Sequence, residues 1–295
     1  TTASYNTATG YQALKTNTTG YSNVASGFKA LFSNTTGIQN TAVGTESLEN
    51  NTTAGQNTAI GNASLRLNTT GDNNVAMGWK ALYSNTTGTQ NTAVGRDALY
   101  SNTTAAYNSA FGKDALYANT TGHSNTAVGR YALRENTTGN YNTATGFESL
   151  RTITTGIENT AVGTFALKLT TGNSNTGVGY QCLATNSTAT NNAAVGTYCL
   201  YLNTTGGNNA ALGYGALQSI TTGSNSSAVG YRTLYSNTTG HSNTAVGKEA
   251  LFNNTTGVYN TAVGYEALVT NSTGVQNTAT GYQALGNNTT GSYNS

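Results

Sequence analysis

The sequence predicts an all-β fold, a parallel β-solenoid (β-roll) of about seventeen coils of seventeen residues with two short strands in each coil. Two observations carry this prediction. Residues 34–50 read NTTGIQNTAVGTESLEN, NTTAGQNTAIGNASLRL follows at once, and similar units continue along all 295 residues. The chain also has no proline, a residue that cannot donate to a β-ladder. A fixed period of this kind indicates one small structural unit stacked on copies of itself.

The repeating unit is NTTGxxNTAVGxxALxx, and its second glycine and its leucine are present in all seventeen copies. Seventeen residues are too few for two helices and a turn, and no apolar pattern has helical spacing. Glycine or asparagine recurs about every four residues, which is unfavourable inside a helix. We therefore expect two strands, at NTAV and at xALx, with the NTTG and NTAVG glycines at the corners.

The repeat predicts a single repeat domain over residues 1–295. Successive copies begin seventeen residues apart, except that Ile153 and Leu169 begin copies sixteen residues apart. We therefore expect one short coil at residues 153–168, with its missing residue in the turn after Leu167. The chain begins and ends within a repeat, at SYNTATG and GSYNS, and is expected to be a segment of a longer fibre.

Alternation along the NTAV strand predicts which side chains point inward. The NTAVG alanine is expected to face the interior of the coil, opposite the leucine. The residue after this alanine then faces outward, although it is apolar in most copies. An exposed apolar stripe marks an interaction site, and we interpret it as an interface between copies of this chain, most simply around a threefold axis. The stripe contains Val43, Ile60, Met77, Val94, Phe111 and Val128.

The NTAVG asparagine predicts a ladder of stacked side-chain amides along the solenoid. Each amide is expected to satisfy backbone groups at the turn that enters the strand. A catalytic or metal-binding role does not call for one copy in every coil, whereas a structural ladder does. The ladder is expected to contain Asn23, Asn40, Asn57, Asn74, Asn91 and Asn260.

The motif NTAVGxxAL resembles the NAVAIGxxAxA repeats in the heads of trimeric autotransporter adhesins. It is still more similar to the GxxNTAVGYQAL arrays of phage tail-fibre-like proteins. The resemblance covers the whole chain and is carried, for instance, by Asn260, Gly264, Ala267 and Leu268. It implies a homotrimeric extracellular fibre, on a cell surface or a virion, that serves adhesion or receptor attachment. The unit is longer here than in the adhesin heads because NTTG adds a wider turn.

Composition argues against several other functions. Charged residues make up 7% of the chain and the net charge is +2, so no basic patch is expected to bind nucleic acid or an anionic membrane. No apolar run approaches the ~20 residues of a membrane-spanning helix. His123 and His241 have no neighbouring Asp or Cys, which argues against a catalytic triad or a zinc site. We expect no catalysis, no cofactor and no metal.

Two sets of residues leave alternatives open. Cys182 and Cys199 occupy the same position of adjacent copies, so they are expected ~4.8 Å apart, either as a disulfide or as two small stacked side chains. The NTTG turns match the N-glycosylation pattern, for instance at Asn34, Asn85 and Asn237. Their asparagines either carry a row of sugars or simply form turns.

Aromatic residues gather after the NTAVG glycine and after the leucine of each unit, for instance Trp79 and Tyr83. We expect surface ladders or trimer contacts there, and as an alternative stacking against the sugar rings of a cell-surface glycan or receptor. The main alternative function for the chain is an ice-binding solenoid with arrays of outward threonine. Against it, Val24 and Ala193 interrupt the threonine of NTAVG, and the NTTG threonines lie at a turn.

Overall fold

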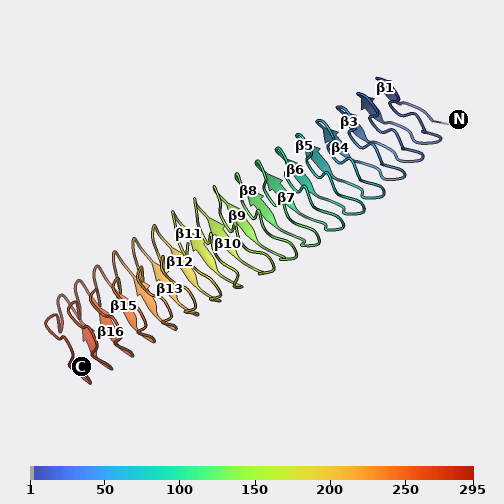
Figure 1. Cartoon of the computed structure of the whole chain (residues 1–295). Coiled ribbons are helices and arrows are strands. Elements are labelled where there is room, and N and C mark those ends of the chain that lie inside the picture. Colours follow the sequence, from blue (N-terminus) through green and yellow to red (C-terminus); the bar gives the residue numbers. More distant parts are fainter. Residues whose placement is uncertain (1–2) are drawn as a thin grey trace. The chain divides into compact units, whose positions relative to one another are not determined.

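Each coil of the chain contributes one three-residue strand to a parallel sheet. The computed structural model describes residues 3–295. The chain divides into two units, Thr1–Thr145 and Gly146–Ser295, and each unit is a parallel β-solenoid of stacked coils (Figure 1). No residue between 3 and 295 is helical. The predicted fold class, an all-β parallel β-solenoid of about seventeen coils, is confirmed.

The strands of the first unit are β1 (Thr7–Thr9), β2 (Val24–Ser26), β3 (Thr41–Val43), β4 (Thr58–Ile60), β5 (Val75–Met77), β6 (Thr92–Val94), β7 (Ser109–Phe111), β8 (Thr126–Val128) and β9 (Thr143–Thr145). Those of the second unit are β10 (Thr160–Val162), β11 (Thr176–Val178), β12 (Ala193–Val195), β13 (Ala210–Leu212), β14 (Ser227–Val229), β15 (Thr244–Val246), β16 (Thr261–Val263) and β17 (Thr278–Thr280).

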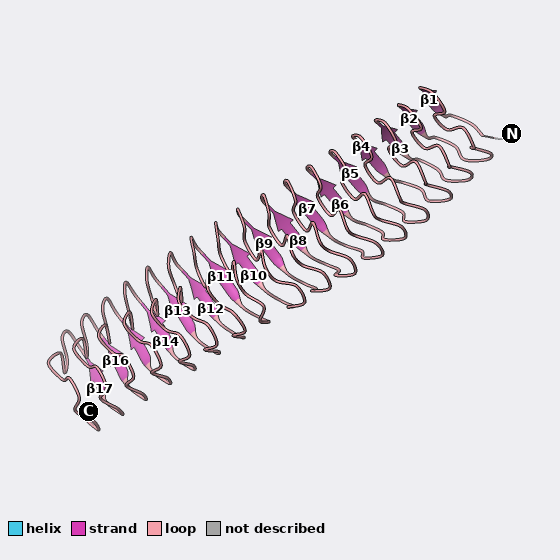
Figure 2. Ribbon diagram, viewed as in Figure 1, coloured by secondary structure: helices cyan, strands magenta, loops and turns pink. Residues whose placement is uncertain are grey.

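Within each unit, consecutive strands are parallel neighbours and equivalent residues of the repeat lie on top of one another (Figure 2). In the first unit, Thr41 pairs with Thr58 and Ala42 with Ala59. In the second unit, Val195 of β12 pairs with Leu212 of β13. Stacking in register means that each repeat position forms a column of like side chains.

The xALx segment differs from the expected second strand, because it is a run of turns. The leucine and the residue two before it both have positive φ, as at Leu48 (50°) and Glu46 (56°). A β-strand needs φ between about −60° and −160°. The segment nevertheless bonds to both neighbouring coils, since Leu48 N–H donates to the Ser64 carbonyl (3.0 Å) and Glu46 N–H to the Phe28 carbonyl (2.8 Å).

The short coil also differs from the expectation, because Thr170 and not Leu169 takes the place of the NTTG asparagine. Leu169 is 46% exposed, whereas Thr170 is buried. Thr170 N–H donates to the Leu167 carbonyl, and its hydroxyl accepts from Asn186 Nδ2 at 2.8 Å, as an asparagine side chain does in other copies. The missing residue is therefore one of the two threonines of this turn.

The interior of each coil is small and consists of the NTAVG alanine, the alanine before the leucine, and the leucine. Ala93, Ala98 and Leu99 are fully buried, and their equivalents are buried in most coils. The expected inward alanine and leucine are therefore found. The leucine reaches this core from a left-handed backbone, with φ of 51° at Leu99.

Candidate interaction faces and internal ladders

The NTAVG asparagines form a hydrogen-bonded ladder inside each unit. Asn40 N–H donates to Asn23 Oδ1 (2.9 Å), and Asn40 Nδ2 donates to the carbonyl of Ala54 in the next coil (2.8 Å). Through its backbone N–H and its side chain together, each ladder residue therefore ties its own coil to both neighbours. The six asparagines expected in the ladder are almost fully buried: Asn23, Asn40, Asn57, Asn74, Asn91 and Asn260. Buried and fully engaged amides are structural groups with no surface for a ligand.

The NTTG asparagines form a second ladder, which was not predicted from the sequence. Asn51 Nδ2 donates to Asn34 Oδ1 (2.9 Å) and to the Ala54 carbonyl (3.0 Å). The Ala54 carbonyl thus accepts from both ladders, which meet at the fourth residue of the unit. The signal was present in the sequence, because the NTTG asparagine recurs nearly as regularly as the NTAVG asparagine.

The candidate glycosylation residues Asn34, Asn85 and Asn237 belong to this second ladder and are fully buried. Asn85 Nδ2 donates to Asn68 Oδ1 (2.8 Å) and to the Gly88 carbonyl (2.9 Å). Asn237 Nδ2 donates to the Gly240 carbonyl at 2.8 Å. A sugar on Nδ2 would replace one of its two N–H groups, so Asn85 could not keep both bonds, and the fully buried side chains leave no space for a sugar in the folded coil. Of the two alternatives, the structure fits the turn-forming role.

The strand face carries two parallel columns of outward side chains. One column contains the expected stripe, in which Val43, Ile60, Met77, Phe111 and Val128 are 37–41% exposed and Val94 is half-buried. The other contains the NTAVG threonines or their replacements. Neither column holds a charged residue in any copy. The strand face is therefore an uncharged, partly apolar surface repeated in every coil.

This face has an apolar hollow over β12, β13 and β14. Alanine replaces threonine at Ala193 and Ala210, and the hollow has a volume of about 330 Å³. Its apolar side chains include Val195, Leu212 and Val229, the stripe residues of these three coils. The hollow therefore belongs to the same uncharged face.

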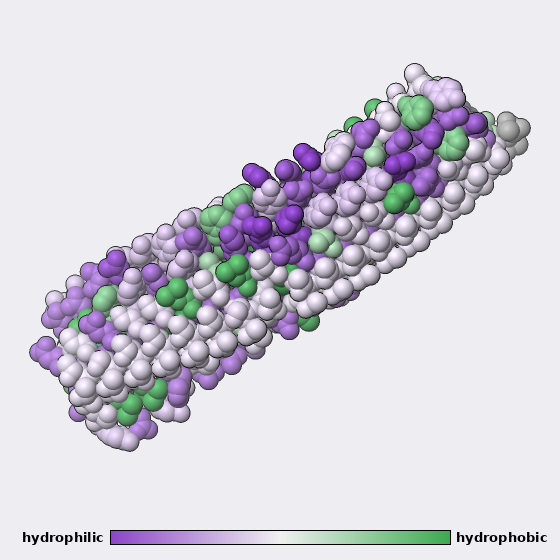
Figure 3. All heavy atoms as spheres, viewed as in Figure 1, coloured by the Kyte–Doolittle hydropathy of each residue, from purple (hydrophilic) through white to green (hydrophobic). Residues whose placement is uncertain are grey.

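The turns after the NTAVG glycine and after the leucine form a second face, which holds most of the charged and aromatic residues. Strongly hydrophilic residues appear in purple in Figure 3. The charges pair locally, with Arg96 and Asp97 3.0 Å apart and Lys113 and Asp114 3.8 Å apart. Tyr83, Tyr100 and Tyr117 stack with ring centroids 5.2 Å apart. This second face therefore consists of ladders of paired charges and stacked rings on the surface.

Glu148 is the best-paired carboxylate of the second unit. Burial opposes its ionisation, but Lys168 (2.9 Å) and Arg151 (3.2 Å) hold the pKa of Glu148 below its usual value. The group is therefore ionised in the fold and acts as an ion-pair partner.

Cys182 and Cys199 are buried free thiols in the core and are not joined by a disulfide. They fill the place of the alanine before the leucine. Cys182 Sγ donates to the Ala194 carbonyl at 3.3 Å. Hydrogen bonding with Cys199, together with burial, raises the pKa of the Cys182 thiol. The two sulfurs thus pack as small core side chains.

His123 and His241 lie in the turns that lead into β8 and β15. Each ring meets a tyrosine edge-to-face, His123 with Tyr141 at 5.0 Å and His241 with Tyr259 at 5.3 Å. Between residues 3 and 295, no group of three or more His, Cys, Asp or Glu side chains is placed to hold a metal. The same residues contain no helix that could cross a membrane.

In comparisons with known proteins, no family model and no curated protein matches the sequence. The fold and its faces therefore define the class of the protein. It is a β-solenoid repeat protein with two internal amide ladders, an uncharged strand face and a face of paired charges and stacked rings.

Proposed function

We propose that the protein is a structural segment of a homotrimeric extracellular fibre used for adhesion or receptor attachment, without catalysis. The observation that carries the proposal is the apolar stripe on the strand face. Its side chains are 37–41% exposed in five of the six copies named above, and no charge interrupts them. The motif resemblance to trimeric adhesin heads and tail-fibre-like arrays supports the same function.

The stripe favours self-association because an apolar residue recurs at its position in most coils. Burying the remaining exposed area of one valine contributes on the order of 1 kcal/mol, at about 25 cal/mol per Å². Contacts repeated coil by coil add within one association event, since the first contact raises the effective concentration of the rest. A second copy of the chain offers the same period and therefore keeps every coil in register.

The hydrogen-bonded ladders suit a load-bearing role. Neighbouring coils are joined by backbone bonds along the strand and the turns, and also by the two buried asparagine ladders. Pulling coils apart within a unit would break these bonds together. A fibre segment needs this resistance to separation along its axis.

Multi-angle light scattering on the full chain tests the proposal. We expect a particle of three times the chain mass of 30.3 kDa. The substitutions Val94→Lys and Phe111→Lys should convert it to monomers, because each would bury an unpaired charge in the interface. Thr138→Lys, at an exposed NTTG threonine, is the matched control and should leave the trimer intact. A monomeric parent chain, or a trimer that tolerates both stripe substitutions, would contradict the proposal.

Ice binding is the alternative, and one observation favours it. Threonines such as Thr41 and Thr58 stack in register on the strand face beside the stripe, about 4.8 Å apart. The first NTTG threonines do not add to such an array, because Thr35 Oγ1, for example, donates to the Thr52 carbonyl of the next coil (3.0 Å). Ice-recrystallisation inhibition by a monomeric chain would favour this alternative over the fibre.

A further inference from the structure

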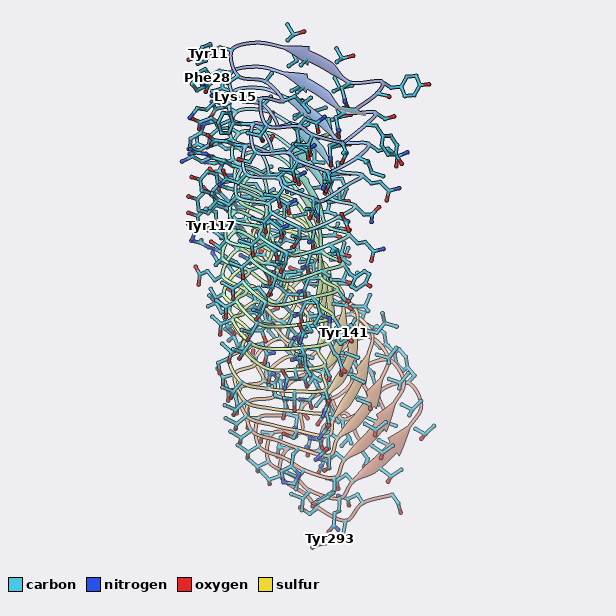
Figure 4. The ribbon with its side chains drawn as sticks, turned by 90° about the vertical axis from the view of Figure 1, so that its right-hand side faces the viewer. Tyr11, Lys15, Phe28, Tyr117, Tyr141 and Tyr293 are labelled. Atoms are coloured by element: carbon cyan, nitrogen blue, oxygen red, sulfur yellow. The ribbon has the colours of Figure 1, made fainter. Side chains whose placement is uncertain are left out.

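A hollow of about 430 Å³ opens at the turns that lead into β7, β8 and β9 of the first unit. Tyr141 lies on the opposite edge of the coils from the rings of Tyr11, Phe28 and Tyr117 (Figure 4). The hollow is lined by Thr104, Ala105, Ala106, Tyr107, Thr121, His123, Ser124 and Tyr141. It is separate from the two columns of the strand face.

Two tyrosines form the walls of the hollow. Tyr107 and Tyr141 are 61% and 58% exposed, and they occupy equivalent positions two coils apart. Two coil spacings amount to roughly 9.6 Å along the axis. The coil between them has only Ser124 at this position. A flat ring in van der Waals contact with an aromatic face on each side needs about 7–8 Å, so a small rotation of Tyr107 toward Tyr141 would enclose one ring.

His123 fixes one of these walls. Its ring lies edge-to-face against Tyr141 with centroids 5.0 Å apart and planes at 89°. The His123 backbone N–H donates to Asn140 Oδ1 (2.8 Å), which holds the turn to the next coil. Tyr141 is therefore oriented before any ligand arrives, which reduces the entropy lost on binding.

The chemistry of the lining selects the ligand. No lining residue carries a formal charge when His is neutral, and hydroxyl groups come from Thr104, Thr121, Ser124 and both tyrosines. Aromatic faces bind apolar C–H surfaces, and the hydroxyls around them match a polar rim. We propose that this hollow binds one neutral pyranose ring of a surface glycan. Binding of a pyranose ring by this hollow does not depend on the fibre function proposed above. Only the source of the sugar, a glycan on the surface that the fibre would contact, rests on that function.

The second unit contains a natural half-site for comparison. His241, Ser242 and Tyr259 repeat the arrangement of His123, Ser124 and Tyr141, including the edge-to-face contact of His241 with Tyr259. Asn225 stands at the position of Tyr107. This cluster has one aromatic wall and should bind the same ring more weakly.

The chain has only two histidines, so ¹H–¹³C NMR of their Cε1–H groups reports on the two clusters separately. The probes are maltotriose, cellotriose and chitotriose, with sorbitol as an open-chain polyol and phenol as a flat aromatic. We expect at least one trisaccharide to move the His123 signal saturably and the His241 signal much less. Sorbitol should have no saturable effect, because it presents no ring.

Three variants test the walls. Tyr107→Ala should weaken the His123 response ~10-fold, whereas Tyr107→Phe should keep it. Asn225→Tyr should create a saturable response at His241, and this gain does not depend on a variant losing its fold. The proposal is overturned if no trisaccharide moves His123, if sorbitol acts equally, or if only phenol binds. Light scattering tests the trimer separately, so either proposal can fail alone.

Discussion

At the residue scale, the strictest requirement is the glycine that ends each NTAVG strand. Its φ lies between 123° and 141° in every copy, a region that side chains rarely adopt. Most copies are also crowded: a Cβ on Gly95 would lie 2.6 Å from the Gly112 carbonyl oxygen. The invariance of this glycine in the sequence therefore has two causes, backbone conformation and the close approach of the next coil.

These two causes can be separated by substitution. Gly95→Ala should destabilise the fold by about 3 kcal/mol or more, because strain and the clash act together. Gly281→Ala is the matched control, since φ is 130° but the nearest heavy atom is Ala284 Cβ at 3.9 Å. It should lose only about 1–3 kcal/mol of backbone strain. Urea unfolding of both variants measures the difference, and equal losses would show that the clash has no effect.

At the element scale, the coil contains one strand where the sequence predicted two. The NTAV strand was predictable because alternation, threonine and valine agree. The xALx segment was not, since leucine is normally excluded from left-handed backbone by about 1–2 kcal/mol. Tertiary packing overrides that preference, because the left-handed turn brings leucines such as Leu48 fully into the core. A local pattern cannot reveal a conformation that only the neighbouring coils stabilise.

The same limit applies to the two asparagine ladders. The NTAVG ladder was predictable from its regularity. The NTTG ladder was obscured because NTT is also typical of turns and because Ile153 and Ile220 suggested that the amide is dispensable. In the second unit, Ile220 is buried in place of the amide, and Asn203 Oδ1 has no hydrogen-bond partner. Replacing the NTTG asparagine by isoleucine is thus tolerated, although it leaves the amide oxygen of a neighbouring asparagine without a hydrogen-bond partner.

Removing one ladder amide should therefore be destabilising. Asn85→Ala deletes the Nδ2 bonds to Asn68 Oδ1 and the Gly88 carbonyl, and also the Oδ1 atom that accepts from Asn102 Nδ2. We expect a loss of roughly 3 kcal/mol, because buried partners are left unpaired. Thr87→Ala, at an exposed threonine of the same turn, should be nearly neutral. Asn85→Ile should lower the free energy of unfolding by an amount between those of Asn85→Ala and Thr87→Ala. Urea midpoints that do not distinguish Asn85→Ala from Thr87→Ala would contradict the role of the ladder.

At the scale of the whole molecule, stability rests on groups that do not titrate. The two ladders consist of asparagine amides and backbone, and the sparse charges lie mainly on the turns. We therefore expect only a weak dependence of stability on pH near neutrality. On the acid side, the lowered pKa of Glu148 means that its contribution is present above the usual value of 4.5 and is lost as the pH falls through the folded value.

At alkaline pH, the stability of the fold should depend on pH because of the buried cysteines. The pKa of Cys182 is raised above its usual value of 9.0, so the folded chain keeps this proton while the unfolded chain releases it as the pH rises. The unfolded state then binds fewer protons, and stability falls with rising pH. The double variant Cys182→Ala/Cys199→Ala, with the residue that most copies have, should reduce this slope. Urea midpoints from about pH 7 to about pH 10 compare both chains, and their shared tyrosines cancel. Parallel slopes would contradict the raised pKa of the buried Cys182 thiol.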